Sequence, residues 1–162
     1  MINTAYILLG SNLGNKEQNL NNAKDLLKKY VGDIEKYSTY FYSEPWGFES
    51  INKFINQAIE IKTQLSPLDL LKQTQFIEKK IGRKTKTNNN VYSDRIIDID
   101  ILFYNNIIYK SNELIIPHPL LHKRLFVLEP LNEIANNLTH PILNKNINSL
   151  LNDIDKKYSV NQ

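Results

Sequence analysis

The sequence predicts an α+β fold of the ferredoxin-like type, in which a mostly antiparallel sheet has its helices packed on one face. Segments rich in β-branched and aromatic residues alternate with two amphipathic helical patterns in the order β-α-β-β-α-β, and further elements follow. The chain of 162 residues shows no internal repeat and no domain boundary. We therefore expect one compact domain over residues 1–162.

The first strand and the first helix are expected in the opening 32 residues. Residues 5–10, AYILLG, form an apolar run that the polar sequence GSNLGN ends, which is typical of a strand and a loop. Asn15, with Gln18 three residues later, has the spacing of a helix cap, and Gly32 stands where the helical pattern stops. The apolar stripe between them recurs at helical spacing: Leu20, Ala23, Leu27, Tyr30 and Val31.

Two strands and a second helix follow. Residues 34–43 and 54–63 are rich in β-branched and aromatic residues, and a loop with proline and glycine separates them. Residues 66–82 carry the clearest helix pattern, with Ser66 as the N-cap, a proline at the first helical position and Gly82 as the terminator.

The second half begins with a polar, basic stretch over 83–94 that has no periodicity and predicts a mobile loop. The apolar run IIDIDILFY at 96–104 predicts the next strand. Three elements are expected after it: a short hairpin over 107–117, a helix over 123–135 interrupted around Pro130, and a short helix over 147–154.

Composition narrows the class of protein. The chain has no cysteine, so it has neither a disulfide framework nor a thiolate metal site. Lys and Arg number 20 against 17 Asp and Glu, and no block of basic residues suggests a nucleic-acid partner. The N-terminal apolar run is too short for a signal segment or a membrane span. We expect a cytoplasmic protein without membrane or nucleic-acid partners.

Two carboxylates interrupt the apolar strand at 96–104. Asp98 and Asp100 are two residues apart, so in an extended strand they point to the same face. Such a pair repels itself unless a cation or donors compensate, and Mg²⁺ prefers oxygen ligands. The alternative is a solvated sheet face whose carboxylates pair with lysines. The opposite face of the strand is expected to hold Ile97, Ile99, Ile101 and Phe103.

Two arginines flank the polar loop beside this pair. Strict alternation puts Arg95 on the face opposite Asp98, so we expect Arg95 at the end of the loop, folded over the acidic face. Arg83 opens the same loop, just past a helix whose edge carries Gln75 and Glu78. Arginines beside a metal-binding carboxylate pair suit a polyphosphate. Taken singly, each of these residues also fits an ordinary surface position.

Four residues suit a flat ring or a phosphate. Phe54 and Asn56 share a strand face and combine a flat surface with an amide that both donates and accepts, although Phe54 also fits a plain core position. Trp46 lies in a loop, where it covers a ligand or caps the core. His118, between two prolines, contacts a phosphate or fills a turn.

The ordered motifs identify a family. GSNLGN follows the first strand, FIN opens the third, QxxE and GR end the second helix, and RxxDxDI, PHP and RxF come later. Over residues 5 to 135 the chain resembles the 6-hydroxymethyl-7,8-dihydropterin pyrophosphokinase family of folate biosynthesis. The resemblance implies a ferredoxin-like sandwich and an ATP-dependent diphosphokinase that transfers pyrophosphate to the hydroxymethyl group of the pterin, giving AMP and the pterin pyrophosphate.

The resemblance also implies a role for each matched residue. Asp98 and Asp100 would hold two Mg²⁺ ions with ATP, and Arg83 and Arg95 would be the catalytic arginines around the phosphates. The nucleotide site would comprise Gln75, Glu78, Arg83, Arg95, Ile101, His118 and Arg124. The pterin site would comprise Pro45, Trp46, Gly47, Phe54, Asn56 and Phe126.

The loop before the aspartates departs from the family pattern. Where the family shows a run like Trp-Gly-Pro-Arg, this chain reads Tyr92-Ser93-Asp94-Arg95. The loop is also longer than in the best-known members, and a second loop arginine falls on Thr85, with Lys84 or Lys86 as substitutes. We expect these changes to affect the geometry of the closed loop and the turnover rate.

A different class of function deserves comparison, namely a non-catalytic nucleotide- or RNA-binding module. Ferredoxin-like sheets also present aromatic side chains to bases, which would account for Phe54 and for the aromatic strand at 37–42. It would leave Asp98 and Asp100 unexplained, since carboxylates repel a nucleic-acid backbone. We therefore expect an enzyme, acting as a monomer on ATP and 6-hydroxymethyl-7,8-dihydropterin.

Overall fold

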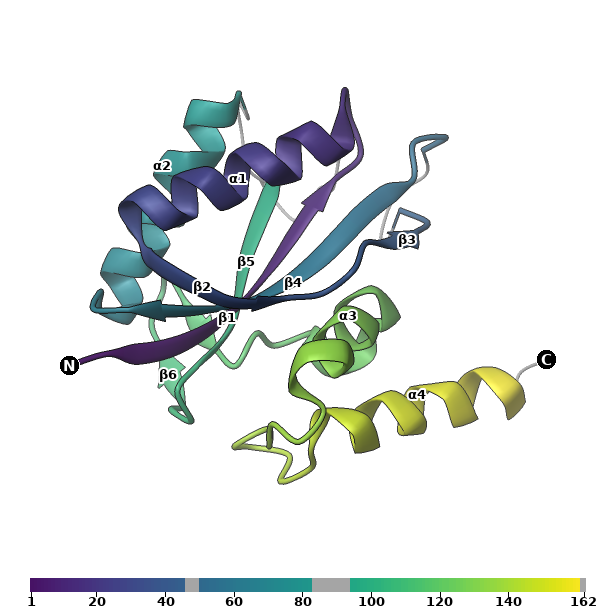
Figure 1. Cartoon of the computed structure of the whole chain (residues 1–162). Coiled ribbons are helices and arrows are strands. Elements are labelled where there is room, and N and C mark those ends of the chain that lie inside the picture. Colours follow the sequence, from purple (N-terminus) through teal and green to yellow (C-terminus); the bar gives the residue numbers. More distant parts are fainter. Residues whose placement is uncertain (46–49, 83–93, 161–162) are drawn as a thin grey trace.

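Four long strands form the centre of the molecule. The computed structural model describes residues 1–45, 50–82 and 94–160, with side chains as far as residue 154. The sheet has the order β2-β4-β1-β5, and every neighbouring pair is antiparallel. This order confirms the ferredoxin-like prediction (Figure 1). The strands are β1 (Asn3–Ser11), β2 (Gly32–Tyr37), β4 (Phe54–Thr63) and β5 (Asp98–Tyr104).

The two predicted helices cover one face of this sheet. Helix α1 (Lys16–Tyr30) begins at Asn15, whose side chain accepts a hydrogen bond from the Gln18 backbone N–H at 3.1 Å. Helix α2 (Pro67–Ile81) begins after Ser66 and ends at Gly82, whose φ of 120° favours glycine. Their apolar stripes pack on the sheet and form the first core: Leu20, Ala23, Leu27, Leu70, Leu71 and Ile77.

The C-terminal helices cover the opposite face of the sheet (Figure 1). The expectation that all helices pack on one face is therefore wrong. A short hairpin of β6 (Tyr109–Lys110) and β7 (Ile115–Ile116) and a 3₁₀ turn at Leu121–Lys123 lead to α3 (Leu125–Ala135) and α4 (Ile147–Val160). These helices form the second core on the sheet with Leu8, Ala58, Leu102 and Phe103.

The expected interruption at Pro130 is wrong, because α3 runs through it. A proline inside a helix removes one backbone hydrogen bond and costs about 3 kcal/mol. Here Pro130 is buried together with Val127, Leu128 and Leu131, so the packing of the apolar stripe offsets that cost.

A β-bulge corrects the predicted face of Phe103. The register between β1 and β5 shifts by one residue, so Tyr6 pairs with Phe103 but Ile7 pairs with Ile101. Ile97, Ile99 and Ile101 enter the first core as predicted, whereas Phe103 enters the second. The extra residue, Leu102, breaks the strict alternation on which the prediction rested.

The strand predicted over 34–43 is divided in two. Residues 32–37 form β2, and β3 (Phe41–Ser43) follows after a break at Ser38. Both pieces pair with β4, and the backbone N–H of Ser38 donates to the Ala58 carbonyl at 2.9 Å across the break. Within the described part of the chain, no helix is long and apolar enough to cross a membrane.

We predict that the protein loses stability in mild acid because of His140, whose ring packs edge-on against Phe103 of the second core. This side chain is 4% exposed, and its Nδ1 accepts hydrogen bonds from the Ile142 and Leu143 backbone N–H groups, at 3.2 and 3.1 Å. Burial, followed by the neighbouring charge of His122, lowers its pKa below the ordinary 6.5. Folding therefore favours the neutral ring, and stability present above about pH 6.5 is lost as the pH falls through the folded pKa.

Chemical denaturation across this pH range tests the prediction. The control is His140→Asn, whose side-chain oxygen replaces Nδ1 as the acceptor but does not titrate. The parent should lose more stability in acid than this variant. Equal losses in the two proteins would assign the pH dependence to other groups.

Candidate active site

The predicted acidic pair lies on the sheet face that α3 and α4 cover. Asp98 stands opposite Gly10 of β1, and Asp100 stands opposite Leu8. Both carboxylates are half-buried, whereas Ile99 between them is 1% exposed and points into the first core. The two carboxylates thus share one face of β5, as the alternation of the strand predicts.

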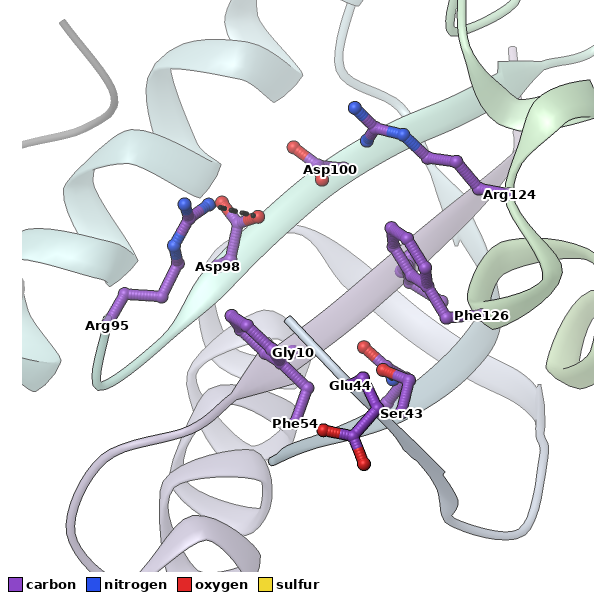
Figure 2. Close-up of a pocket in the computed structure, with 11 residues that line it drawn as sticks. Gly10, Ser43, Glu44, Phe54, Arg95, Asp98, Asp100, Arg124 and Phe126 are labelled. Carbon is purple, nitrogen blue, oxygen red and sulfur yellow. Dashed lines mark hydrogen bonds and ion pairs between the residues drawn. The ribbon is translucent and has the colours of Figure 1, made fainter. Parts of the chain in front are cut away.

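Arg95 folds back over this acidic face, which confirms its predicted position. Its Nη1 lies 3.1 Å from Asp98 Oδ2, and the arginine side chain is 9% exposed (Figure 2). An ion pair this close in a sheltered site is stronger than an exposed surface pair. The carboxylate is therefore not simply a solvated charge on the sheet.

A pocket opens directly beside the acidic pair. We call it the aromatic pocket, and its floor is Gly10, where a Cβ atom would lie 3.2 Å from Asn56 Oδ1 and 3.6 Å from Phe54 Cδ1. The absence of a side chain at Gly10 therefore keeps this floor open. The lining residues are Leu8, Gly10, Ser43, Glu44, Phe54, Asn56, Arg95, Asp98, Asp100, Arg124 and Phe126 (Figure 2).

Each arginine of the aromatic pocket is paired with one of its phenylalanines. Arg95 Cζ lies 5.9 Å from the centre of the Phe54 ring, and Arg124 Cζ lies 5.5 Å from that of Phe126. Such cation–π contacts hold a guanidinium and a ring together. Asn56 is 2% exposed and its Nδ2 donates to Ser43 Oγ at 2.7 Å, which fixes the direction of the amide.

A second pocket lies along the outer edge of β5, between α2 and the β6–β7 hairpin. We call it the edge pocket, and Asp100 lines both pockets. The His118 backbone N–H donates to the Leu102 carbonyl at 3.0 Å and thereby places the imidazole at this edge. The lining residues are Leu71, Ile99, Asp100, Ile101, Ser111, Asn112, Glu113, Leu114, Ile115, His118 and Pro119.

Two residues predicted for the nucleotide site differ in exposure. Gln75 is exposed on α2. Glu78 is 3% exposed, and its Oε2 accepts a hydrogen bond from the Ile99 backbone N–H at 3.1 Å. Through this hydrogen bond Glu78 holds the backbone of β5 between Asp98 and Asp100. Neither Gln75 nor Glu78 lines the two pockets described above.

One residue predicted for the pterin site, Pro45, is half-buried and lines neither pocket. Trp46, Gly47 and Arg83 lie outside the described residues, as does the loop predicted over 83–94 except for Asp94.

Sequence reasoning missed four lining residues of the aromatic pocket, namely Leu8, Gly10, Ser43 and Glu44. A signal for Gly10 was present, because it stands where the first strand meets its loop. Ser43 enters only because β3 pairs it with Phe54. That pairing joins two separate segments, and the sequence of neither segment alone predicts it.

The acidic pair fits a divalent cation that is also bound by a ligand. Carboxylate oxygens on one strand face suit a hard cation such as Mg²⁺. Among the described residues, no group of three or more His, Asp or Glu side chains gathers to hold a metal alone. Mg²⁺ commonly binds through one or two carboxylates together with the phosphates of a nucleotide, and Asp98 and Asp100 provide such a pair.

Comparison with known proteins identifies close relatives. A 2-amino-4-hydroxy-6-hydroxymethyldihydropteridine pyrophosphokinase of Porphyromonas gingivalis is 43% identical over 133 residues, covering 80% of this chain and 89% of that protein. The protein of the same name from Bacillus subtilis is 42% identical over 136 residues, covering 83% of this chain and 80% of that protein.

Solved structures agree on the fold. The crystal structure of wild-type Plasmodium falciparum HPPK-DHPS with STZ-DHP matches with a TM-score of 0.78 at 21% identity, over 99% of this chain. The match covers 45% of that chain, so this protein spans less than half of its length. The model of the 7,8-dihydro-6-hydroxymethylpterin-pyrophosphokinase (HPPK) family matches residues 6–136. Since this match covers most of the sequence, the chain belongs to the HPPK family.

Proposed function

We propose that this chain performs the reaction of its family at the junction of the aromatic and edge pockets. As a member of the HPPK family, the protein is an ATP-dependent pyrophosphokinase of folate synthesis. It transfers pyrophosphate from ATP to the hydroxymethyl group of 6-hydroxymethyl-7,8-dihydropterin and gives AMP and the pterin pyrophosphate.

The position of Asp100 carries the assignment of the site. This carboxylate lines both pockets, so a ligand in each would meet at the acidic pair. The aromatic pocket, with Phe54, Phe126 and the Asn56 amide, suits a flat pterin that needs stacking and hydrogen bonds. The edge pocket, with Ile101 and His118, then takes the nucleotide. Such an arrangement brings the two reactants together and lowers the entropic part of the barrier.

Asp98 and Asp100 would hold the divalent metal that an ATP-using kinase needs, which we assign as two Mg²⁺ ions. The bound ions would supply neutralisation of the phosphate charge. Arg95 and Arg124 add two positive charges at the same place, and Arg95 is held there through Asp98. The other predicted contacts of the nucleotide, Gln75, Glu78 and Arg83, stay predictions, as do Pro45, Trp46 and Gly47 for the pterin.

We further propose that residues 1–162 act as one catalytic domain, as a monomer in the cytoplasm. The two pockets support the first part, because segments from both halves of the chain line the same site. The aromatic pocket takes Gly10 from the first strand and Phe126 from α3, which are far apart in sequence. The expected absence of membrane and nucleic-acid partners also stays a prediction.

The primary test is a direct assay of the reaction. Purified protein is mixed with ATP, MgCl₂ and 6-hydroxymethyl-7,8-dihydropterin, and AMP and pterin pyrophosphate are separated and quantified. AMP should form only when the pterin is present, and EDTA should abolish it because Asp98 and Asp100 alone do not replace the metal. Formation of ADP and phosphate, or no turnover by folded protein, would contradict the proposed function.

Removing either carboxylate should stop turnover without unfolding the protein. We expect Asp98→Ala and Asp100→Ala each to lower kcat by at least about 100-fold, since the charge that holds the metal is lost. Asp153→Ala is the matched control, because Asp153 forms a surface ion pair with Lys145 at 2.8 Å, away from both pockets. Near-normal rates for the site variants would refute the metal assignment, and circular dichroism would verify their fold.

Arg95 should matter more in the transition state than in the ground state. We expect Arg95→Ala to lower kcat about 100-fold while the Kd for ATP changes by less than about threefold, because the guanidinium meets charge that develops during transfer. Steady-state kinetics and calorimetric binding of an ATP analogue give the two numbers. The control is Lys145→Ala, and weaker binding with an unchanged kcat would be the opposite result.

A further inference from the structure

Three separate segments meet at a polar cluster next to Arg95, which we call the Asn12 junction (Asn12, Asn52 and Asp94). Asn12 Nδ2 donates to Asp94 Oδ1 at 2.7 Å and to the Asn52 carbonyl at 3.2 Å. Asn52 Nδ2 donates to the other carboxylate oxygen of Asp94 at 3.1 Å. The carboxylate of Asp94 therefore ties the loop after β1 to the segment that precedes β4.

The same asparagine grips the backbone of Arg95 from both sides. The Arg95 N–H donates to Asn12 Oδ1 at 2.7 Å, and the Asn12 N–H donates to the Arg95 carbonyl at 3.1 Å. Asn12 is only 2% exposed, so water competes little for these bonds. The Asn12 side chain binds Asp94 through its Nδ2 and Arg95 through its Oδ1. The bond to Asp94 therefore fixes the orientation of the Asn12 side chain in which Oδ1 points to the Arg95 N–H.

Asp94 is ionised in this cluster. Burial opposes its charge, but hydrogen bonds from Ser50, Asn52 and Asn12, with the nearby charge of Arg95, outweigh burial and lower the pKa of the carboxyl. A carboxylate that accepts several hydrogen bonds is a rigid anchor, because each bond to the charged group is stronger than a neutral one.

The Asn12 junction fixes the backbone position from which the Arg95 side chain extends. Arg95 precedes the first residue of β5 by three positions, and sheet pairing does not fix its backbone. Its guanidinium nevertheless lies 3.1 Å from Asp98 and 5.9 Å from the Phe54 ring centre. A side chain with four rotatable bonds loses considerable entropy in such a position, so a backbone fixed in advance makes the pose more favourable.

We propose that Asp94, acting through Asn12, is a positioning residue that fixes the Arg95 backbone and thereby holds its guanidinium at the acidic pair. The proposal rests on the function proposed above. Asp94 does not line either pocket and has no direct part in transfer. On this proposal, the effect of Asp94 on turnover passes through Arg95, and an effect that passed through Asn52 and β4 instead would persist without the Arg95 guanidinium.

A double-mutant cycle tests this dependence. Asp94→Ala should lower kcat about tenfold in the parent and by less than about twofold in an Arg95→Ala background, because no guanidinium is left to misplace. Glu133→Ala is the matched control, since this carboxylate also joins two segments, accepting from the Thr39 N–H at 2.9 Å and its hydroxyl at 2.8 Å, outside both pockets. The control should leave kcat unchanged in both backgrounds. Equal losses from Asp94→Ala in the two backgrounds, or no loss in the parent, would overturn the proposal.

A second measurement does not depend on turnover. Amide hydrogen exchange followed by NMR should show the Arg95 N–H exchanging at least about tenfold faster in Asp94→Ala than in the parent, because Asn12 Oδ1 is no longer held. Unchanged exchange would refute the proposal. If the parent makes no AMP, the proposed function fails and this measurement alone decides the role of Asp94. Should Asp94→Ala not fold, Asp94→Asn replaces it, since asparagine keeps one acceptor oxygen. We then expect a smaller loss of kcat, again only in the presence of Arg95, and a smaller increase in the exchange rate of the Arg95 N–H.

Discussion

The pairing of β1 with both β4 and β5 determines where the site stands. Gly10, near the end of β1, lies opposite Asn56 on one side and Asp98 on the other. The three residues form one row across β4, β1 and β5. In this row the Asn56 amide, which suits a flat ring, and the Asp98 carboxylate, which suits a metal, lie on either side of Gly10. The backbone hydrogen bonds of the sheet fix the backbone positions of these three residues relative to one another. Arg124, the N-cap residue of α3, and Phe126, in its first turn, then complete the lining of the aromatic pocket.

Charges of both signs meet in the aromatic pocket. Asp98, Asp100 and Glu44 bring three negative charges, Arg95 and Arg124 bring two positive ones, and Glu44 also forms an ion pair with Lys53. Each guanidinium also lies near an aromatic ring, so the groups that suit phosphate and the groups that suit the pterin are held in pairs. Movement of either arginine would therefore change its contact with the neighbouring ring. The proposed phosphate-binding and pterin-binding groups thus form one cluster.

Local pattern predicted most of the fold and part of the site, and the family resemblance added Arg124 and Phe126. Capping by Asn15 and Ser66 and the alternation around Asp98 depend on neighbours in sequence, and such short-range rules are reliable where each residue agrees with the next. The bulge at Leu102 and the entry of Gly10 depend on pairing between distant segments, which no single segment encodes. Glu78 illustrates the same limit, because its burial follows from the approach of α2 to the edge of β5.

The bulge at Leu102 has a mechanical consequence. Ile101 belongs to the core under α1 and α2, and the next two residues, Leu102 and Phe103, belong to the core under α3 and α4. One short strand is thus shared by both cores, and its opposite end carries Asp98 and Asp100. The packing of the C-terminal helices on Leu102 and Phe103 therefore bears on the same strand that carries the acidic pair. Among the residues whose side chains the structure describes, α4 contributes none to either pocket, so its contact with the site runs through the second core and β5.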